Sequence, residues 1–230
     1  MAPRSVLGKV FIMRRKAIIS PGEYYHIYNR GVEKRKIFLD KKDYIRFQKL
    51  LYLSQNQKAV VYKETKNKKL GEIPINNKSV YIGSYCLMPN HFHILIKEKE
   101  GGGISNFMRK LLTAYSMYFN KKYNRKGPLF ESRFYSQHID SDNYLKYIYS
   151  YICLNPTKLI DPEWKDRGIK DPNKALKYCS DYEYSSTRDH LGIKRDENLI
   201  LDLKEFPEYF VNTKDFKSEL LDWLKYAELE

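Results

Sequence analysis

The chain has 230 residues, and its 42 Lys and Arg against 28 Asp and Glu give a net charge of +14. Such a positive field favours a phosphate-rich partner, above all nucleic acid, although a Lys-rich host composition would give the same sign. The 42% hydrophobic residues are enough for one sizeable core. No apolar run reaches the roughly 18 residues of a membrane span, and the three cysteines form no CxxC pair. We therefore expect a soluble cytoplasmic protein without membrane spans or a disulfide framework.

The amino-terminal part predicts an arm, a strand and a helix. Residues 1–20 are basic with little regular pattern and are expected to be a frayed arm that touches phosphates at most. Residues 23–29 are rich in strand formers and predict the first strand. Asp40 is predicted to cap an amphipathic helix over Lys41–Leu53, whose apolar residues recur at helical spacing and require a sheet to cover.

The middle of the chain predicts a hairpin. Residues 63–79 are polar and rich in turn formers, which indicates a mobile loop or a hairpin tip. Residues 80–88 and 91–97 have strand character on either side of Pro89-Asn90, so we expect them to pair antiparallel at the centre of the sheet.

Two helices and a strand follow. Ser105 is predicted to cap a helix to about Lys122, and residues 129–139 predict a further strand or extended segment. Asp140 or Ser141 is predicted to cap a third helix over 142–154, which Asn155-Pro156 ends. The order of these elements indicates an α+β sandwich, in which helices pack on one face of an antiparallel sheet.

The carboxy-terminal residues 161–230 differ in character. A charged connector with Pro and Gly leads into helical patterns near 175–178, 185–191 and 216–229. We expect a small helical extension that packs on the core, where it either contacts DNA, holds a neighbouring subunit or only stabilises the fold.

His91-Phe92-His93 is the first pattern that indicates chemistry. Side chains alternate along a strand, so His91, His93 and Leu95 would share one face while Phe92, Ile94 and Ile96 enter the other. Two neighbouring imidazoles can offer nitrogen ligands to one divalent ion with further coordination positions open. The alternative is two histidines on a solvated face, since an isolated His-x-His pattern is weak.

The third predicted helix carries the second pattern. Leu145, Ile148 and Ile152 form its core stripe, while Tyr144, Tyr151 and Asn155 fall together along the edge of that stripe. A tyrosine at such an edge can keep its ring packed while its hydroxyl reaches a site beside the sheet, and Asn155, one turn after Tyr151, can aim its amide oxygen at the same place. The alternative is ordinary aromatic packing in a chain with 21 tyrosines.

Together these segments resemble a known family. The chain is similar to the single-tyrosine HUH transposases, most closely their REP-associated tyrosine transposase branch, over residues 21 to about 192. The motifs that carry the resemblance occur in the family's order: Tyr25-His26-Ile27-Tyr28-Asn29-Arg30-Gly31, Met88-Pro89-Asn90-His91-Phe92-His93, Gly127-Pro128-Leu129-Phe130-Glu131-Ser132-Arg133-Phe134, Tyr151-Ile152-Cys153-Leu154-Asn155-Pro156 and Tyr184-Ser185-Ser186.

The resemblance implies a ferredoxin-like catalytic domain over 21–160 that nicks and transfers single-stranded DNA at hairpins flanked by a short tetranucleotide. It implies a prokaryotic, nucleoid-associated enzyme that works as a monomer or homodimer with Mg²⁺ or Mn²⁺. By position, His91, His93 and Asn155 would be the metal ligands and Tyr151 the nucleophile of a 5′-phosphotyrosine intermediate. Candidate DNA contacts are His26, Arg30, Lys110, Arg133 and His138, and the two isolated histidines are alternatively further ligands.

Two other functions stay open. A related HUH endonuclease of replication or conjugation would share the chemistry, although the Gly127–Phe134 motif favours the transposase branch. A non-catalytic ferredoxin-like binder of RNA or DNA would instead display stacking aromatic residues on its central strands, where this chain has His91 and His93.

Overall fold

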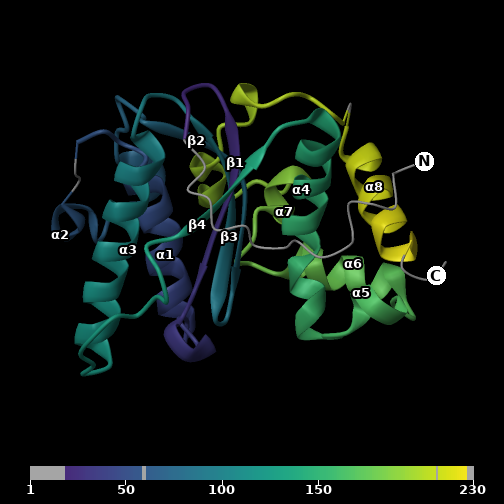
Figure 1. Ribbon diagram of the computed structural model, residues 1–230, viewed down its shortest axis with the longest axis horizontal. Coiled ribbons are helices and arrows are strands. Elements are labelled where there is room, and N and C mark those ends of the chain that lie inside the picture. Colours follow the sequence, from purple (N-terminus) through teal and green to yellow (C-terminus); the bar gives the residue numbers. More distant parts are fainter. Residues whose placement is uncertain (1–18, 59–60, 211, 227–230) are drawn as a thin grey trace.

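The computed structural model describes residues 19–58, 61–210 and 212–226, and its centre is a four-stranded antiparallel sheet (Figure 1). Its strands β1 (Tyr24–Arg30), β2 (Val80–Met88), β3 (His91–Glu98) and β4 (Tyr135–Ile139) lie in the order β2-β3-β1-β4. Helices α1 (Lys41–Ser54) and α3 (Gly103–Lys122) connect them, so the chain order is strand, helix, strand, strand, helix, strand. This is the ferredoxin-like arrangement, and the predicted α+β class is confirmed.

The main core lies between the sheet and the helices α1 and α3. Phe92, Ile94 and Ile96 of β3 point to this side, where they pack with apolar residues of both helices. Because side chains alternate along a strand, the neighbouring His91, His93 and Leu95 point to the opposite face. The predicted division of this strand into an apolar and a histidine-bearing face is therefore confirmed.

The other face of the sheet is covered too, which corrects the expectation of helices on one face only. Helix α4 (Asp142–Leu154) packs its Leu145, Ile148 and Ile152 against Leu95 and the β2 residues Cys86 and Met88. These strand residues are apolar and would otherwise face water, so the second layer has a hydrophobic cause. Figure 1 shows α1 and α3 on one side of the sheet and α4, α5, α6 and α8 on the other.

Several predicted boundaries shift. Helix α3 begins at Gly103, not after Ser105, because the buried Glu98 carboxylate accepts hydrogen bonds from the Gly103 and Ile104 amides at 2.9 and 2.6 Å and so caps the helix. The hairpin β2-β3 forms as predicted, but β2 is an edge strand and not a central one. Strand β4 is confined to Tyr135–Ile139.

Short helices occupy much of the remaining chain. The predicted loop 63–79 overlaps α2 (Tyr62–Thr65) and contains a 3-10 helix, and it buries Thr65, Leu70 and Ile73. The predicted arm lies outside the described residues except for Ile19 and Ser20. The 3-10 helices are η2 (Val32–Lys34), η3 (Leu70–Glu72), η4 (Asn155–Leu159), η5 (Asp196–Ile200) and η6 (Leu203–Glu205).

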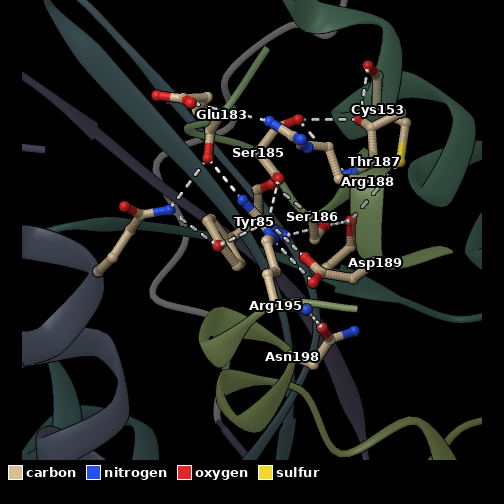
Figure 2. A network of polar contacts seen from close by, with 12 residues as sticks. Tyr85, Cys153, Glu183, Ser185, Ser186, Thr187, Arg188, Asp189, Arg195 and Asn198 are labelled. Carbon is tan, nitrogen blue, oxygen red and sulfur yellow. Dashed lines mark hydrogen bonds and ion pairs between the residues drawn. The ribbon is translucent and has the colours of Figure 1, made fainter. Parts of the chain in front are cut away.

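The carboxy-terminal segment contains α5 (Trp164–Arg167), α6 (Pro172–Asp181), α7 (Thr187–His190) and α8 (Thr213–Tyr226). Part of it completes the edge of the sheet, because the Leu87 amide donates to the Tyr184 carbonyl and the Ser186 amide donates to the Tyr85 carbonyl, each at 2.9 Å. Figure 2 shows the buried polar network around this junction. An edge strand with unpaired backbone groups is thereby covered.

Candidate functional site: histidines, a tyrosine and two lysines beside the sheet

Three histidines meet on the face of the sheet that α4 covers. His91 and His93 belong to β3, and His26 belongs to the neighbouring strand β1. The His91 and His93 ring centroids lie 5.0 Å apart, and His26 Nε2 lies 2.8 Å from His93 Nδ1. The His-x-His pattern is thus extended by a third imidazole from a strand 65 residues earlier in the chain.

Hydrogen bonds orient these imidazole rings. Asn90 Nδ2 donates to the Lys34 carbonyl at 3.3 Å, which turns Asn90 Oδ1 toward His91 Nδ1 at 2.7 Å. Because an amide oxygen only accepts, His91 Nδ1 carries the proton and Nε2 keeps its lone pair. His26 can orient His93 in the same way if His93 Nδ1 is the donor of their hydrogen bond.

Burial keeps these histidines neutral near pH 7. It lowers the pKa of His26 to about 3 and that of His91 to about 4. It also holds the pKa of His93 well below its ordinary value, with the charges of neighbouring groups acting in the same direction. A neutral imidazole is the form that binds a metal ion, so the environment favours ligation over a proton.

Tyr151 lies against the histidines from helix α4. Its half-buried ring has its centroid 5.3 Å from that of His93 and 5.7 Å from that of His26. Burial raises the pKa of Tyr151, and the nearby Asn155 amide opposes part of that rise. The predicted helix 142–154 is confirmed in its bounds, with Ser141 as its cap, and it brings Tyr151 to the histidine-bearing face.

Asn155 follows directly at the end of α4. Its side chain is more deeply buried than the predicted edge position, at 2% exposed, and it also raises the pKa of the adjacent His91 against the effect of burial. Neither its Oδ1 nor its Nδ2 has a well-formed hydrogen bond. Buried amide atoms without partners are costly, so this oxygen is placed to receive something that the chain itself does not supply.

Two lysines complete the site. Lys165 of α5 has its Nζ 4.2 Å from the Tyr151 ring centroid, and Lys158 of η4 has its Nζ 5.9 Å from the same centroid. Both charges contribute to the lowered pKa of His93, after burial and the neighbouring histidines. The site is therefore electropositive beside its tyrosine.

Comparison with known proteins identifies the matched part of the chain. Residues 48–155 match the family model of IS200-like transposases. This segment is similar to the IS200-like transposases. It contains β2, β3, α3, β4 and α4, and with them His91, His93, Tyr151 and Asn155.

One solved structure that the chain is similar to is a REP-associated tyrosine transposase bound to a REP hairpin. The identity is 15%, the TM-score is 0.48, and the match covers 85% of this chain and 98% of the other. No curated protein matches the chain.

Two of the candidate DNA contacts are exposed arginines. Arg30 pairs with His91 across β1 and β3, is 49% exposed and forms an ion pair with Glu131. Arg133 is exposed in the bend before β4, and its carbonyl oxygen accepts a hydrogen bond from Asn29. Both arginines are available to a strand that approaches from solvent.

The other three candidates are placed differently. His26 is buried against His93, which fits a role in orienting that ring better than contact with DNA. His138 shares the face of Tyr25 on the far side of the sheet, where it pairs with Glu23 at 2.8 Å. Lys110 is half-buried on α3 and donates to the Asn56 carbonyl, away from the histidines.

The imidazole nitrogens and the amide oxygen of the site are the atoms that would bind a divalent ion. Within residues 19–58, 61–210 and 212–226, no three His, Cys, Asp or Glu side chains are grouped to hold a metal. Two neutral imidazoles and the unpartnered Asn155 oxygen nevertheless fit an ion whose remaining positions are filled by water or phosphate. Imidazole nitrogens suit Mn²⁺ better than Mg²⁺, which prefers oxygen ligands.

The sequence patterns did not single out Lys158 or Lys165. Lys158 is seven residues after Tyr151, which corresponds to two helical turns and would have placed it on the tyrosine's side of the helix. Lys165 belongs to a separate short helix, so only the tertiary fold brings it to the site.

Among the described residues, none of the helices combines the length and the hydrophobicity of a membrane span.

Proposed function

We propose that this protein is a metal-dependent endonuclease and strand transferase for single-stranded DNA, which acts through a 5′-phosphotyrosine intermediate on Tyr151. The observation that carries the proposal is the position of the Tyr151 ring against His93, next to the unpartnered amide of Asn155. The IS200-like family of residues 48–155 is a family of transposases, and strand cleavage and transfer is the chemistry that this arrangement suits.

In the proposed reaction the Tyr151 oxygen attacks the scissile phosphorus. The new bond is Tyr151 O to phosphorus, the broken bond is phosphorus to the 3′ oxygen, and the proton that the phenol loses balances the proton that the 3′-hydroxyl gains. The phosphotyrosine link keeps the bond energy of the phosphodiester, so a later 3′-hydroxyl can reverse the step without ATP. Tyrosine has an ordinary pKa near 10, so it needs help to attack at neutral pH.

His91, His93 and Asn155 would hold the divalent ion. When bound, this ion would supply Lewis-acid stabilisation of the phosphate oxygens. His26 would fix the ring of His93, and Asn90 fixes that of His91, so the two ligands are oriented before DNA arrives. The Tyr151 hydroxyl would approach the phosphorus from the side of α4.

The proposed substrate is a single-stranded hairpin with a short tetranucleotide at its foot. The net charge of +14 and the exposed side chains of Arg30 and Arg133 support a DNA partner. We propose further that the chain belongs to the REP-associated branch and acts as a monomer or homodimer.

The test is covalent trapping on the hairpin DNA with Mn²⁺ or Mg²⁺. The wild type should form a denaturant-resistant adduct that mass spectrometry locates on Tyr151, and Tyr151→Phe should form none. Tyr144→Phe is the matched control, because Tyr144 is a half-buried tyrosine of the same helix that stacks on Tyr147. His91→Ala and His93→Ala should lower the rate of adduct formation by at least 100-fold.

Five outcomes would count against the proposal. An adduct on Tyr144, or wild-type adduct formation by Tyr151→Phe, would remove Tyr151 as the nucleophile. Full activity in EDTA would remove the metal. Tight hairpin binding without any cleavage would favour a non-catalytic DNA-binding protein, whereas cleavage of a plain origin-like strand would favour an HUH endonuclease of replication or conjugation.

A further inference from the structure

Lys158 occupies an unusual position in the proposed site. It lies on η4, the 3-10 helix that begins at Asn155, so the same turn of chain carries the amide and the ammonium group. Its side chain is half-buried, with Nζ 5.9 Å from the Tyr151 ring centroid. Its charge contributes to the lowered pKa of both His91 and His93.

Lys158 has no counter-ion among the residues that the structure describes. No carboxylate forms an ion pair with it in the part of the chain that the structure describes, although Lys146 on the preceding helix pairs with Glu219 at 2.9 Å. Burial lowers the pKa of Lys158, which is the sign of an ammonium group that has lost water without gaining an anion. Such a position costs folding free energy, so the anion that offsets it is expected to come from outside the chain.

Lys165 of helix α5 adds a second positive charge beside Tyr151. Its Nζ lies 4.2 Å from the Tyr151 ring centroid, so the nucleophile has cations from both η4 and α5 beside it. Among the described residues, the groups that shift the pKa of Tyr151, His91 and His93 include no carboxylate. A metal ion alone would meet two positive side chains there, whereas a phosphate would be attracted by them.

We propose that Lys158, with Lys165 beside it, binds the non-bridging oxygens of the scissile phosphodiester and of the phosphotyrosine that replaces it. This inference rests on the proposed function, because it assigns the phosphate that Tyr151 attacks. An ammonium group is a point-charge ligand for phosphate and does not need the fixed fork of arginine. Negative charge on these oxygens grows during transfer, so the lysine also stabilises the transition state.

The decisive experiment measures DNA binding without chemistry. In a Tyr151→Phe background, Lys158→Gln is compared with Lys174→Gln, which removes an equal charge from an exposed position on α6. Each protein is titrated with the hairpin strand and with the same strand carrying a neutral methylphosphonate at the scissile position. Lys158→Gln should weaken binding of the normal strand at least fivefold and leave binding of the methylphosphonate strand unchanged. Lys174→Gln should affect both strands alike.

A second measurement separates positioning from folding. With Tyr151 intact, Lys158→Gln should slow adduct formation at saturating DNA by tenfold or more, and Lys158→Arg should restore most of the rate. Without DNA, Lys158→Gln should unfold at a temperature equal to or above that of the wild type, because it removes an unpaired half-buried charge.

The outcomes distinguish this inference from the proposed function. If the wild type forms no adduct, the proposed function fails. If the wild type forms the adduct but Lys158→Gln matches Lys174→Gln on both strands, the nucleophile stands and the phosphate role of Lys158 is overturned. Equal weakening of both strands by Lys158→Gln would also overturn it, since the lysine would then contribute only general charge.

Discussion

His26 contacts the proposed ligand His93 directly, because its Nε2 lies 2.8 Å from His93 Nδ1. Replacing it by Ala removes the group that fixes the His93 ring while leaving the proposed ligands in place. We expect Mn²⁺ affinity, measured calorimetrically in the presence of uncleavable hairpin DNA, to fall by about 10- to 100-fold. His26→Gln should recover part of the affinity, because its amide oxygen can accept from His93 Nδ1.

The control for His26 is His138→Ala on the other face of the sheet, where the imidazole pairs with Glu23. It should leave Mn²⁺ affinity unchanged. Equal affinity of His26→Ala and the wild type would show that His93 is oriented by its own packing, and His26 would then be a buried residue without a role at the site.

Sequence patterns located some of these residues and missed others for a physical reason. Strand alternation and helical phase are local, so they placed His91 and His93 on one face and Tyr151 on the side of α4 that meets it. The contact of His26 with His93 depends on the pairing of β1 with β3, which no local pattern encodes. The same holds for Lys165, whose short helix reaches Tyr151 only in the folded chain.

At the scale of elements, a buried ion pair stabilises the carboxy-terminal residues that cover β2. Arg195 contacts Asp189 at 2.5 Å and donates to the Ser185 and Glu183 carbonyls at 2.6 and 2.7 Å (Figure 2). The Asp189 side chain is fully buried and that of Arg195 is 13% exposed. These contacts hold the residues that cover the β2 edge.

Breaking this pair on one side should therefore be costly. Asp189→Ala leaves Arg195 partly buried without its anion, and we expect a loss of about 3 to 5 kcal/mol in the free energy of unfolding. The matched control is Asp181→Ala, which breaks the exposed pair with Lys177 on α6 and should cost about 0.5 kcal/mol or less. Urea unfolding of the three proteins measures both. A loss below about 1 kcal/mol for Asp189→Ala would mean that water reaches Arg195 when its partner is removed.

Some boundaries of helices and strands can be predicted from the sequence, and others cannot. The bounds of β2 and α4 follow from apolar patterns and from the cap at Ser141, which are visible in the sequence. The start of α3 does not follow from a pattern in the sequence, because its cap is the side chain of Glu98 from the preceding strand. The second layer on the sheet is not predictable from the sequence, because the apolar stripe of α4 does not indicate which face of the sheet it covers.

For the whole molecule, buried histidines make stability depend on pH. His190 of α7 lies in the carboxy-terminal segment, between the rings of Tyr149 and Phe216 at 5.4 and 5.3 Å. Burial lowers its pKa to about 4, the charge of Arg195 acts in the same direction, and the Gly83 backbone opposes it. Its Nε2 is buried without a hydrogen-bond partner.

The sign of the effect follows from linkage. The unfolded chain takes up a proton on His190 near its ordinary pKa of about 6.5, whereas the folded chain does so only near 4. Between these values the unfolded state binds more protons, so the free energy of unfolding falls as the pH falls from 6.5 to 4 and levels off below. The full contribution is about 3 kcal/mol, from about 1.4 kcal/mol for each unit of pKa difference.

His190→Phe tests this contribution, because it keeps a ring between Tyr149 and Phe216 and removes the titrating group. Urea unfolding at several pH values gives the free energy of unfolding as a function of pH. Between pH 6.5 and 4 its slope should be shallower for His190→Phe than for the wild type, by an amount that corresponds to the uptake of up to one proton. Stability at pH 8 should change little, and His138→Phe on the sheet edge serves as the control for ring substitution. Identical slopes for His190→Phe and the wild type would mean that His190 takes up its proton in the folded protein, with Tyr149 and Phe216 parting enough to admit water.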